Sequence, residues 1–285
     1  MLLIVAFALA GCATVPPPRV DYSFALLGDV PYSHAQANQL DELIRQINAE
    51  PLSFVVHVGD ITSGKGPCDD GWLESRRIQF GRLRHPFVLL PGDNEWTDCH
   101  RSGFDPLERL ARWRGLFCSV SPELGVERQS NLDARFPEYC EHVRWRSGDV
   151  FYIALNVPGS NNNLGRTKDM DLEHARRMDA VFEWLDESLA RAEFLGAAGV
   201  VVLMHANPDF EGGRRRRPDG YERLRNVLGT HAGWQRVPLL LVHGDTHTFR
   251  DDRPLPGLHR IEVYGSPQVR WLRATVSGGR VTVSD

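Results

Sequence analysis

The sequence predicts an α/β fold, and three observations lead to that prediction. Apolar runs of strand length alternate with segments whose apolar residues recur at helical spacing. From Leu258 onward only short strand-like runs separated by glycine-rich turns remain. Five of the apolar runs end abruptly on an acidic residue or a histidine. Alternation followed by an all-strand tail is typical of mixed sheets flanked by helices.

In the first half of the chain, strands and helices are expected to alternate. The helix at Ser33–Glu50 is predicted by apolar residues at helical spacing, and Asp105-Pro106 is a good N-cap and first-turn pair. The charged stretch Glu123–Arg146 is expected to be irregular. The expected elements are strand Tyr22–Val30, helix Ser33–Glu50, strand Ser53–Asp60, helix Gly71–Gly81, strand His85–Asp93, helix Asp105–Phe117 and strand Asp149–Asn156.

The second half is expected to continue the alternation and then to end in antiparallel strands. Short apolar runs separated by turns such as Ser277-Gly278-Gly279 indicate the antiparallel tail. The arginine run Arg214–Arg217 is either a solvated loop or a contact for phosphate or anionic lipid. The expected elements are loop Val157–Arg166, helix Met170–Phe194, strand Gly199–His205, loop Pro208–Pro218, helix Gly220–Leu228, strand Val237–Gly244 and tail strands Leu258–Tyr264, Val269–Val276 and Arg280–Val283.

Polar residues follow five of the expected strands at the point where each strand ends. Four apolar runs stop at Gly-Asp, and a fifth ends on His205. Open α/β sheets place their sites at the carboxyl ends of strands, so these side chains are expected to meet. A single Gly-Asp is often only a turn or a helix cap, but the ordered set indicates a site. The four acidic residues are Asp29, Asp60, Asp93 and Asp245.

The chemistry of this set indicates a metal centre. Oxygen donors with two imidazoles suit divalent ions of hard to intermediate character. Several carboxylates in one place would repel each other without cations, and two metal ions would resolve that repulsion. We therefore expect two divalent ions (Mn, Fe, Mg, Ca or Zn), with the candidate ligands Asp29, Asp60, Asp93, Asn94, His205, Asp245 and His247.

Composition sets limits on the class of protein. The chain has 285 residues, of which 42% are apolar and 25% charged, and a formal net charge of -4. This is an ordinary globular composition, and its charge balance gives no reason to expect nucleic acid as a partner. We see no linker after Val20, so residues 21–285 are expected to form one domain, and we expect a monomer.

The N-terminus resembles that of a bacterial lipoprotein. Met1–Ala10 is apolar but shorter than the roughly 20 residues of a membrane-spanning helix, which fits a signal peptide. The tetrad Leu9-Ala10-Gly11-Cys12 resembles a lipobox, although a basic n-region is missing. We expect residues 1–11 to be a signal peptide, Cys12 to carry lipid, and 12–20 to be a Pro-rich tether. The alternative is a plain signal peptide with an incidental cysteine.

This N-terminus predicts an exported protein of the cell envelope. By analogy with enteric lipoproteins, Ala13 in place of Asp favours the periplasmic face of the outer membrane. The four other cysteines then suggest two disulfides, with three possible pairings. Cys68 lies in the loop after Gly59-Asp60, and Cys99 in the loop after Gly92-Asp93. If the two strands before these loops are neighbours, a Cys68–Cys99 disulfide would join the loops, and Cys118 would pair with Cys140. The alternative is that Cys68 and Cys99 bind metal.

The order of the strand-end motifs resembles the calcineurin-like metallophosphoesterases. The chain reads Asp29, Gly59-Asp60, Gly92-Asp93-Asn94-Glu95, His205 and Gly244-Asp245-Thr246-His247 in that order. The resemblance implies a four-layer α/β/β/α sandwich of two mixed sheets. It implies that Asp29, Asp60 and His247 hold one metal, and that Asp93, His205 and Asp245 join a bridging Asp60 on the second.

The resemblance also implies an activity, the hydrolysis of phosphate mono- or diesters by a metal-bridging hydroxide. The catalytic roles would fall to Asp60, Asn94 and His205, and the substrate would be a small-molecule or lipid-like phosphoester. The main alternative is a non-catalytic metal- or ligand-binding lipoprotein on the same fold. A structural lipoprotein with Ca-stabilised loops is a third hypothesis.

Three positions depart from the family pattern by losing an imidazole. Pro31 stands where the first motif has a histidine, with Tyr32 just beyond it. Asn94 replaces the histidine that would orient substrate or protonate the leaving group, and it cannot donate a proton usefully. Asp245 replaces another histidine, and Asp93 replaces the usual Asn ligand. Tyr32 could ligate a ferric ion, as a tyrosine does in purple acid phosphatases, although the spacing differs.

Overall fold

The computed structural model describes residues 21–118, 124–213, 216–234 and 236–285. The expected signal peptide, Cys12 and the tether lie outside the described residues, as do Arg214 and Arg215 of the arginine run. Within the described ranges, no helix is both long enough and apolar enough to cross a membrane.

The smaller sheet contains five strands in the order β12-β11-β1-β2-β3. Strands β1, β2 and β3 are parallel neighbours, and β11 and β12 extend the sheet in antiparallel pairing. The carboxyl ends of the three parallel strands therefore lie side by side. The bounds are β1 Tyr22–Leu27, β2 Val55–His57, β3 Phe87–Leu89, β11 Leu272–Ser277 and β12 Arg280–Ser284.

The larger sheet contains seven strands in the order β4-β5-β6-β7-β8-β10-β9. Its centre, from β6 through β7 and β8 to β10, is parallel, and both edges are antiparallel. The bounds are β4 Glu127–Arg128, β5 Val143–Ser147, β6 Val150–Ala154, β7 Gly199–Leu203, β8 Leu239–His243, β9 Arg250–Leu255 and β10 Leu258–Glu262.

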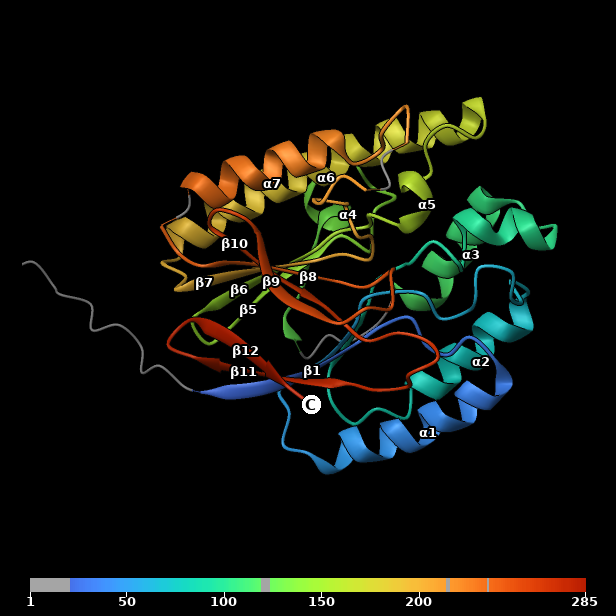
Figure 1. Ribbon diagram of the computed structural model, residues 1–285, viewed down its shortest axis with the longest axis horizontal. Coiled ribbons are helices and arrows are strands. Elements are labelled where there is room, and N and C mark those ends of the chain that lie inside the picture. Colours follow the sequence, from blue (N-terminus) through green and yellow to red (C-terminus); the bar gives the residue numbers. More distant parts are fainter. Residues whose placement is uncertain (1–20, 119–123, 214–215, 235) are drawn as a thin grey trace, which may run out of the picture.

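The two sheets face each other, and helices cover both outer sides (Figure 1). One apolar core fills the space between the sheets, and two more lie between each sheet and its helices. This is the expected α/β sandwich of two mixed sheets. Helices α1, α2 and α3 cover the smaller sheet, and α6 and α7 the larger. Their bounds are α1 His34–Ala49, α2 Asp70–Phe80, α3 Pro106–Phe117, α6 Lys168–Phe194 and α7 Glu222–Trp234.

Short elements account for most differences from the expected structure. The stretch expected to be irregular contains β5, whose inward side chains Val143 and Trp145 are buried between the sheets. Strand β9 was not expected, because its sequence Arg-Asp-Asp-Arg-Pro-Leu has no apolar alternation. The tail strand β10 is antiparallel only to β9, and it runs parallel to β8, so the expected all-antiparallel tail is wrong there.

Three further short elements complete the chain near the strand ends. They are the 3-10 helix η1 Thr97–Ser102, the turn α4 Gln129–Leu132 and the turn α5 Gly159–Asn162. In α5 and just after it, residues 160–163 all have positive φ between 48° and 64°. A run of left-handed residues without glycine is rare, because each costs roughly 1–2 kcal/mol. It was expected only as a polar loop.

Candidate metal centre

The candidate ligands all lie just beyond the carboxyl ends of parallel strands. Asp29, Asp60 and Asp93 follow β1, β2 and β3 of the smaller sheet, and His205 and Asp245 follow β7 and β8 of the larger. Because the sheets face each other, residues from two separate strand sets meet at one end of the sandwich. The side chains of Asp29, Asp60, Asp93 and His205 are buried.

The backbone turns sharply where these side chains enter the site. Asp29, Asp60, Asp245 and His247 have positive φ of 55°, 61°, 82° and 60°. Asp and His tolerate this left-handed conformation better than most residues, and such strain clusters at functional sites. A Cβ on Gly92 would lie 2.0 Å from Asp60 Oδ1, so only glycine lets the two loops approach this closely.

His205 stands at the centre of the cluster. Its Nδ1 lies 3.0 Å from the carbonyl oxygen of Val58 and donates its proton there. Nε2 then faces Asp93 Oδ1 at 3.1 Å and Asp60 Oδ1 at 3.4 Å. A histidine whose Nδ1–H is held by a carbonyl has Nε2 available as a metal ligand.

Two sets of ligand atoms are close enough to hold a cation each. Asp29, Asp60 and His205 offer atoms within 4.8 Å of one another, and so do Asp93, His205 and Asp245. His205 is common to both sets. The resemblance instead made Asp60 the shared residue, and the structure places its carboxylate in the first set only. A third set, Cys118, Cys140 and Glu141, includes two cysteines that form a disulfide.

Tyr32 and His247 close the side of the first set. The Tyr32 hydroxyl donates to Asp60 Oδ2 at 2.7 Å and lies 3.0 Å from His247 Nε2. His247 Nε2 is 3.5 Å from Asp29 Oδ1. The chain therefore brings a phenol beside the candidate ligands from the residue just after Pro31, which stands where the first motif has its histidine. Tyr32 reaches the cluster although its spacing from Asp29 differs from that of the metal-binding tyrosine in purple acid phosphatases.

Asn94 fixes the position of Asp60. Its backbone N–H donates to Asp60 Oδ1 at 2.9 Å, and its side-chain amide donates to Oδ2 of the same carboxylate and to the carbonyl of Thr62. Both Asp60 oxygens are thus oriented by one residue. Glu95, which is fully buried, accepts from the backbone N–H groups of Gly92 and Asp60 and so ties the two loops together.

Electrostatics shows that the cluster is short of positive charge. Burial raises the pKa of Asp29 to about 8 and raises the pKa of Asp60 well above its ordinary value. Burial alone would lower the pKa of His205, but Asp60, Asp93 and Asp29 outweigh it and raise that pKa instead. Within the described ranges, no Lys or Arg forms an ion pair with Asp29, Asp60 or Asp93. Divalent cations fit this donor set, because they would supply the missing charge and displace its protons.

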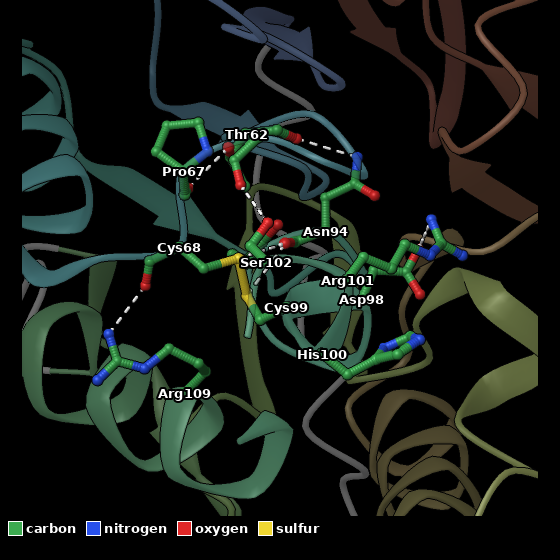
Figure 2. The surroundings of a disulfide bond; sticks show 12 residues. Thr62, Pro67, Cys68, Asn94, Asp98, Cys99, His100, Arg101, Ser102 and Arg109 are labelled. Carbon is green, nitrogen blue, oxygen red and sulfur yellow. Dashed lines mark hydrogen bonds and ion pairs between the residues drawn. A yellow bond between two sulfur atoms is a disulfide. The ribbon is translucent and has the colours of Figure 1, made fainter. Parts of the chain in front are cut away.

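A disulfide holds the loops behind the cluster in place (Figure 2). Cys68, in the loop after β2, is bonded to Cys99, in η1 after β3, and Cys118 is bonded to Cys140. This confirms two disulfides in the pairing that neighbouring strands implied, and it excludes Cys68 and Cys99 as metal ligands. Both sulfur atoms of the first disulfide lie 3.4 Å from the carbonyl oxygen of Asn94.

Ser160 and Asp98 belong to the site but could not be identified from the sequence. The Ser160 hydroxyl lies 2.8 Å from Asp93 Oδ2 and 2.8 Å from both oxygens of Asp98. Burial and the charge of Asp93 raise the pKa of Asp98 to about 7, although Arg101 pairs with it at 2.6 Å. Both residues lie in segments expected to be loops, and no motif marks them.

Glu262 holds the last motif from the side of β10. Its carboxylate accepts from the backbone N–H and the hydroxyl of Thr246, and it pairs with Arg250 at 2.5 Å. Burial raises the pKa of Glu262 to about 7. Thr246 lies between Asp245 and His247, so this contact fixes the loop that carries both.

A cavity of about 610 Å³ opens above the cluster. Asp60, Asp93, Asp245 and His247 form part of its lining, together with Tyr32. The candidate metal centre is therefore open on one side to a space large enough for a small molecule.

Comparison of the sequence with known proteins finds distant relatives. No protein-family model matches the chain. Over 171 residues it is 25% identical to purple acid phosphatase 22 of Arabidopsis thaliana, covering 55% of this chain and 36% of that protein. Over 215 residues it is 22% identical to purple acid phosphatase 21 of the same plant, covering 72% and 46%. The chain thus spans less than half the length of these two relatives.

Solved structures establish the fold. A dimetal phosphatase from Danio rerio matches with a TM-score of 0.60 at 14% identity, covering 92% of this chain and 95% of that one. A purple acid phosphatase from yellow lupin (Lupinus luteus) seeds matches with a TM-score of 0.56 at 13% identity, covering 92% and 50%. Identities this low show the fold alone. The chain therefore has the calcineurin-like metallophosphoesterase fold, with distant similarity to purple acid phosphatases and dimetal phosphatases.

Proposed function

We propose that this protein is a metal-dependent hydrolase of phosphate mono- or diesters. The observation that carries the proposal is the cluster of Asp29, Asp60, Asp93 and Asp245 around His205, on a metallophosphoesterase fold and beneath an open cavity. Two divalent cations would be held by these residues with His247. When bound, such ions polarise a phosphoryl oxygen and lower the pKa of water.

The protein's own residues would orient the reacting groups. Asn94 fixes both oxygens of Asp60, and Val58 fixes the tautomer of His205 that leaves Nε2 available. The Asn94 amide and the Tyr32 hydroxyl both line the cavity, and their hydrogen bonds to Asp60 hold its carboxylate beside the place where a phosphoryl group would bind. In hydrolysis, water supplies the new oxygen on phosphorus, the ester P–O bond breaks, and the leaving alkoxide takes a proton.

The replacement of a histidine by Asn94 supports a rival function, the binding of metal without catalysis. A carboxamide cannot protonate a leaving alkoxide. Turnover with metal bound distinguishes the two functions. The purified protein should be loaded separately with Mn, Fe, Mg, Ca and Zn and assayed on p-nitrophenyl phosphate and on a bis-ester. Metal bound at one to two ions per chain without any turnover would favour the rival.

The decisive variant is Asp60→Asn, which keeps the shape of the side chain and removes its charge. We expect it to lower metal content and to reduce kcat/KM by at least about a hundredfold, because Asp60 touches His205, Asn94 and Tyr32. Asp251→Asn, at an exposed position of β9, is the matched control and should keep the metal content and the kcat/KM of the wild type. Full activity and full metal content in Asp60→Asn would refute the mechanism.

A further inference from the structure

Apart from two glycines, the described residues that line the cavity all carry polar side chains, and this bears on the substrate. Among the described residues that line it, none is aliphatic and none is Phe or Trp. Its aromatic members are Tyr32, Tyr221 and His247. The Tyr221 hydroxyl already donates to the carbonyl of Pro158. Small-molecule pockets are usually lined mostly by apolar side chains, so a wall of this kind is unusual.

Charges on the wall balance each other away from the metal centre. Among the described residues of the wall, four acidic and four arginine side chains lie beyond the candidate ligands. Several form ion pairs within the protein, so they present neutral, hydrogen-bonding surfaces rather than one strong charge. The pairs are Asp98 with Arg101 at 2.6 Å, Asp219 with Arg225 at 2.5 Å and Glu211 with Arg260 at 2.5 Å.

Two groups on the wall retain unused hydrogen-bond donors. Arg216 has no hydrogen bond or ion pair with any residue that the structure describes. In the same described ranges, the side-chain amide nitrogen of Asn207 also lacks an acceptor, while its Oδ1 accepts from Asp209. Asn207 follows the candidate ligand His205 by two residues, so this donor lies at the side of the metal centre.

We propose that the cavity accepts phosphate esters of polyhydroxylated alcohols, such as sugars and polyols, and discriminates against lipid and alkyl esters. Hydroxyl groups can bond to the paired carboxylates, to Arg216 and to Asn207. An alkyl chain would instead desolvate these groups and leave them unpaired, which lowers its affinity for the cavity. The inference rests on the proposed function. It also narrows the substrate, because the sequence is compatible with both small-molecule and lipid-like phosphoesters.

Balanced wall charges also argue against a leaving group that carries several further negative charges. A polyanion would gain little from the three wall arginines that already pair with carboxylates, which are Arg101, Arg225 and Arg250. A neutral sugar or polyol matches the charge balance, and the cavity of about 610 Å³ lies within the usual range for small-molecule sites.

The test compares substrates that differ only in hydroxyl groups. Glucose 6-phosphate and n-hexyl phosphate are both primary phosphate esters of six-carbon alcohols, and ribose 5-phosphate with n-pentyl phosphate forms a second pair. For the metal-loaded protein we expect kcat/KM to favour the sugar ester by at least about tenfold in one pair. No preference in either pair, or a rate that rises with alkyl chain length, would overturn the inference.

A variant of Arg216 tests whether the cavity wall causes the preference for sugar esters over alkyl esters. Arg216→Leu should lower the ratio of the two kcat/KM values by at least about threefold, because it replaces a hydrogen-bond donor with an apolar side chain. Arg253→Leu, an exposed arginine of β9 that does not line the cavity, is the matched control and should leave the ratio unchanged. An unchanged ratio in Arg216→Leu would remove Arg216 from the proposal and contradict it.

The outcomes separate this inference from the function on which it rests. If p-nitrophenyl phosphate is hydrolysed and neither sugar ester is, the proposed hydrolase stands and the substrate inference is wrong. If no ester is hydrolysed while metal is demonstrably bound, the proposed function fails and the substrate inference fails with it.

Discussion

Tyr32 shows how a side chain outside the motifs can reach the candidate ligands. The first motif lacks its histidine, yet the Tyr32 hydroxyl lies 2.7 Å from Asp60 and 3.0 Å from His247. We expect Tyr32→Phe to weaken metal binding and to lower kcat/KM by roughly 10–100-fold, the usual effect of removing a group that orients metal ligands. Tyr264→Phe, which alters a tyrosine stacked on Phe249, is the control. Wild-type metal affinity in Tyr32→Phe would exclude a role at the centre.

Protonation of the cluster gives a prediction for the metal-free protein. Burial raises the pKa of Asp29 to about 8, so the folded state holds a proton there that the unfolded state has lost. The raised pKa of His205 acts in the same direction above its ordinary value. Below about pH 7.5 the buried histidines His57, His142 and His243, whose pKa values burial lowers to about 3, act in the opposite direction. The free energy of unfolding should therefore fall as pH rises through about 8, where the unfolded histidines are already neutral and the folded state still binds the proton of Asp29.

Bound metal should reverse that trend, because cations require the deprotonated ligands. Thermal unfolding at about pH 7.5, 8.2 and 9, with chelator and with Mn²⁺, measures the effect. We expect the melting temperature to fall with pH in chelator and to fall less, or to rise, with metal. A chelated protein whose melting temperature rises steadily over this range would contradict the assignment of protons to the cluster.

At the scale of elements, the sequence predicts the regular helices and strand ends but not the irregular segments between them. Long periodic segments such as α1, α3 and α6 lie within about two residues of the expected bounds, because an amphipathic face and a cap define them. The Gly-Asp sequences at strand ends could be identified because each follows a continuous apolar run. Side chains in irregular segments could not, since η1 and the left-handed turn at 160–163 depend on tertiary contacts for their shape.

The disulfides allow a comparison of stability with function. Cys68–Cys99 closes 31 residues and Cys118–Cys140 closes 22, so by chain entropy each should stabilise the fold by about 3.5 kcal/mol. Only the first touches Asn94, which orients Asp60. Replacing both cysteines of either pair by serine should lower the free energy of unfolding similarly. Metal affinity and kcat/KM, measured well below the melting temperatures, should fall for Cys68/Cys99 alone; equal losses in both double variants would contradict this.

On the scale of the whole molecule, the described chain begins at the amino end of β1 (Figure 1), whereas the candidate metal centre lies beyond the carboxyl ends of the strands. The described chain begins at Asp21, directly before β1, and Asp29 follows the far end of that strand. Six residues of strand separate the two ends by about 20 Å. We propose that a lipid on Cys12 tethers the protein through the amino end of β1, which is the end of the sandwich away from the cavity.

This placement predicts that the anchor and the activity are separable. In cells that express the full chain, Cys12→Ser should move the protein from the membrane fraction to the soluble periplasmic fraction. Its kcat/KM for a water-soluble phosphate ester should match that of the wild type, because the cavity lies at the opposite end of the sandwich. Ala13→Ser, which keeps the cysteine, should stay with the membrane. Unchanged membrane partition of Cys12→Ser would refute lipidation, whereas a large loss of activity would show that the tether contributes to the site.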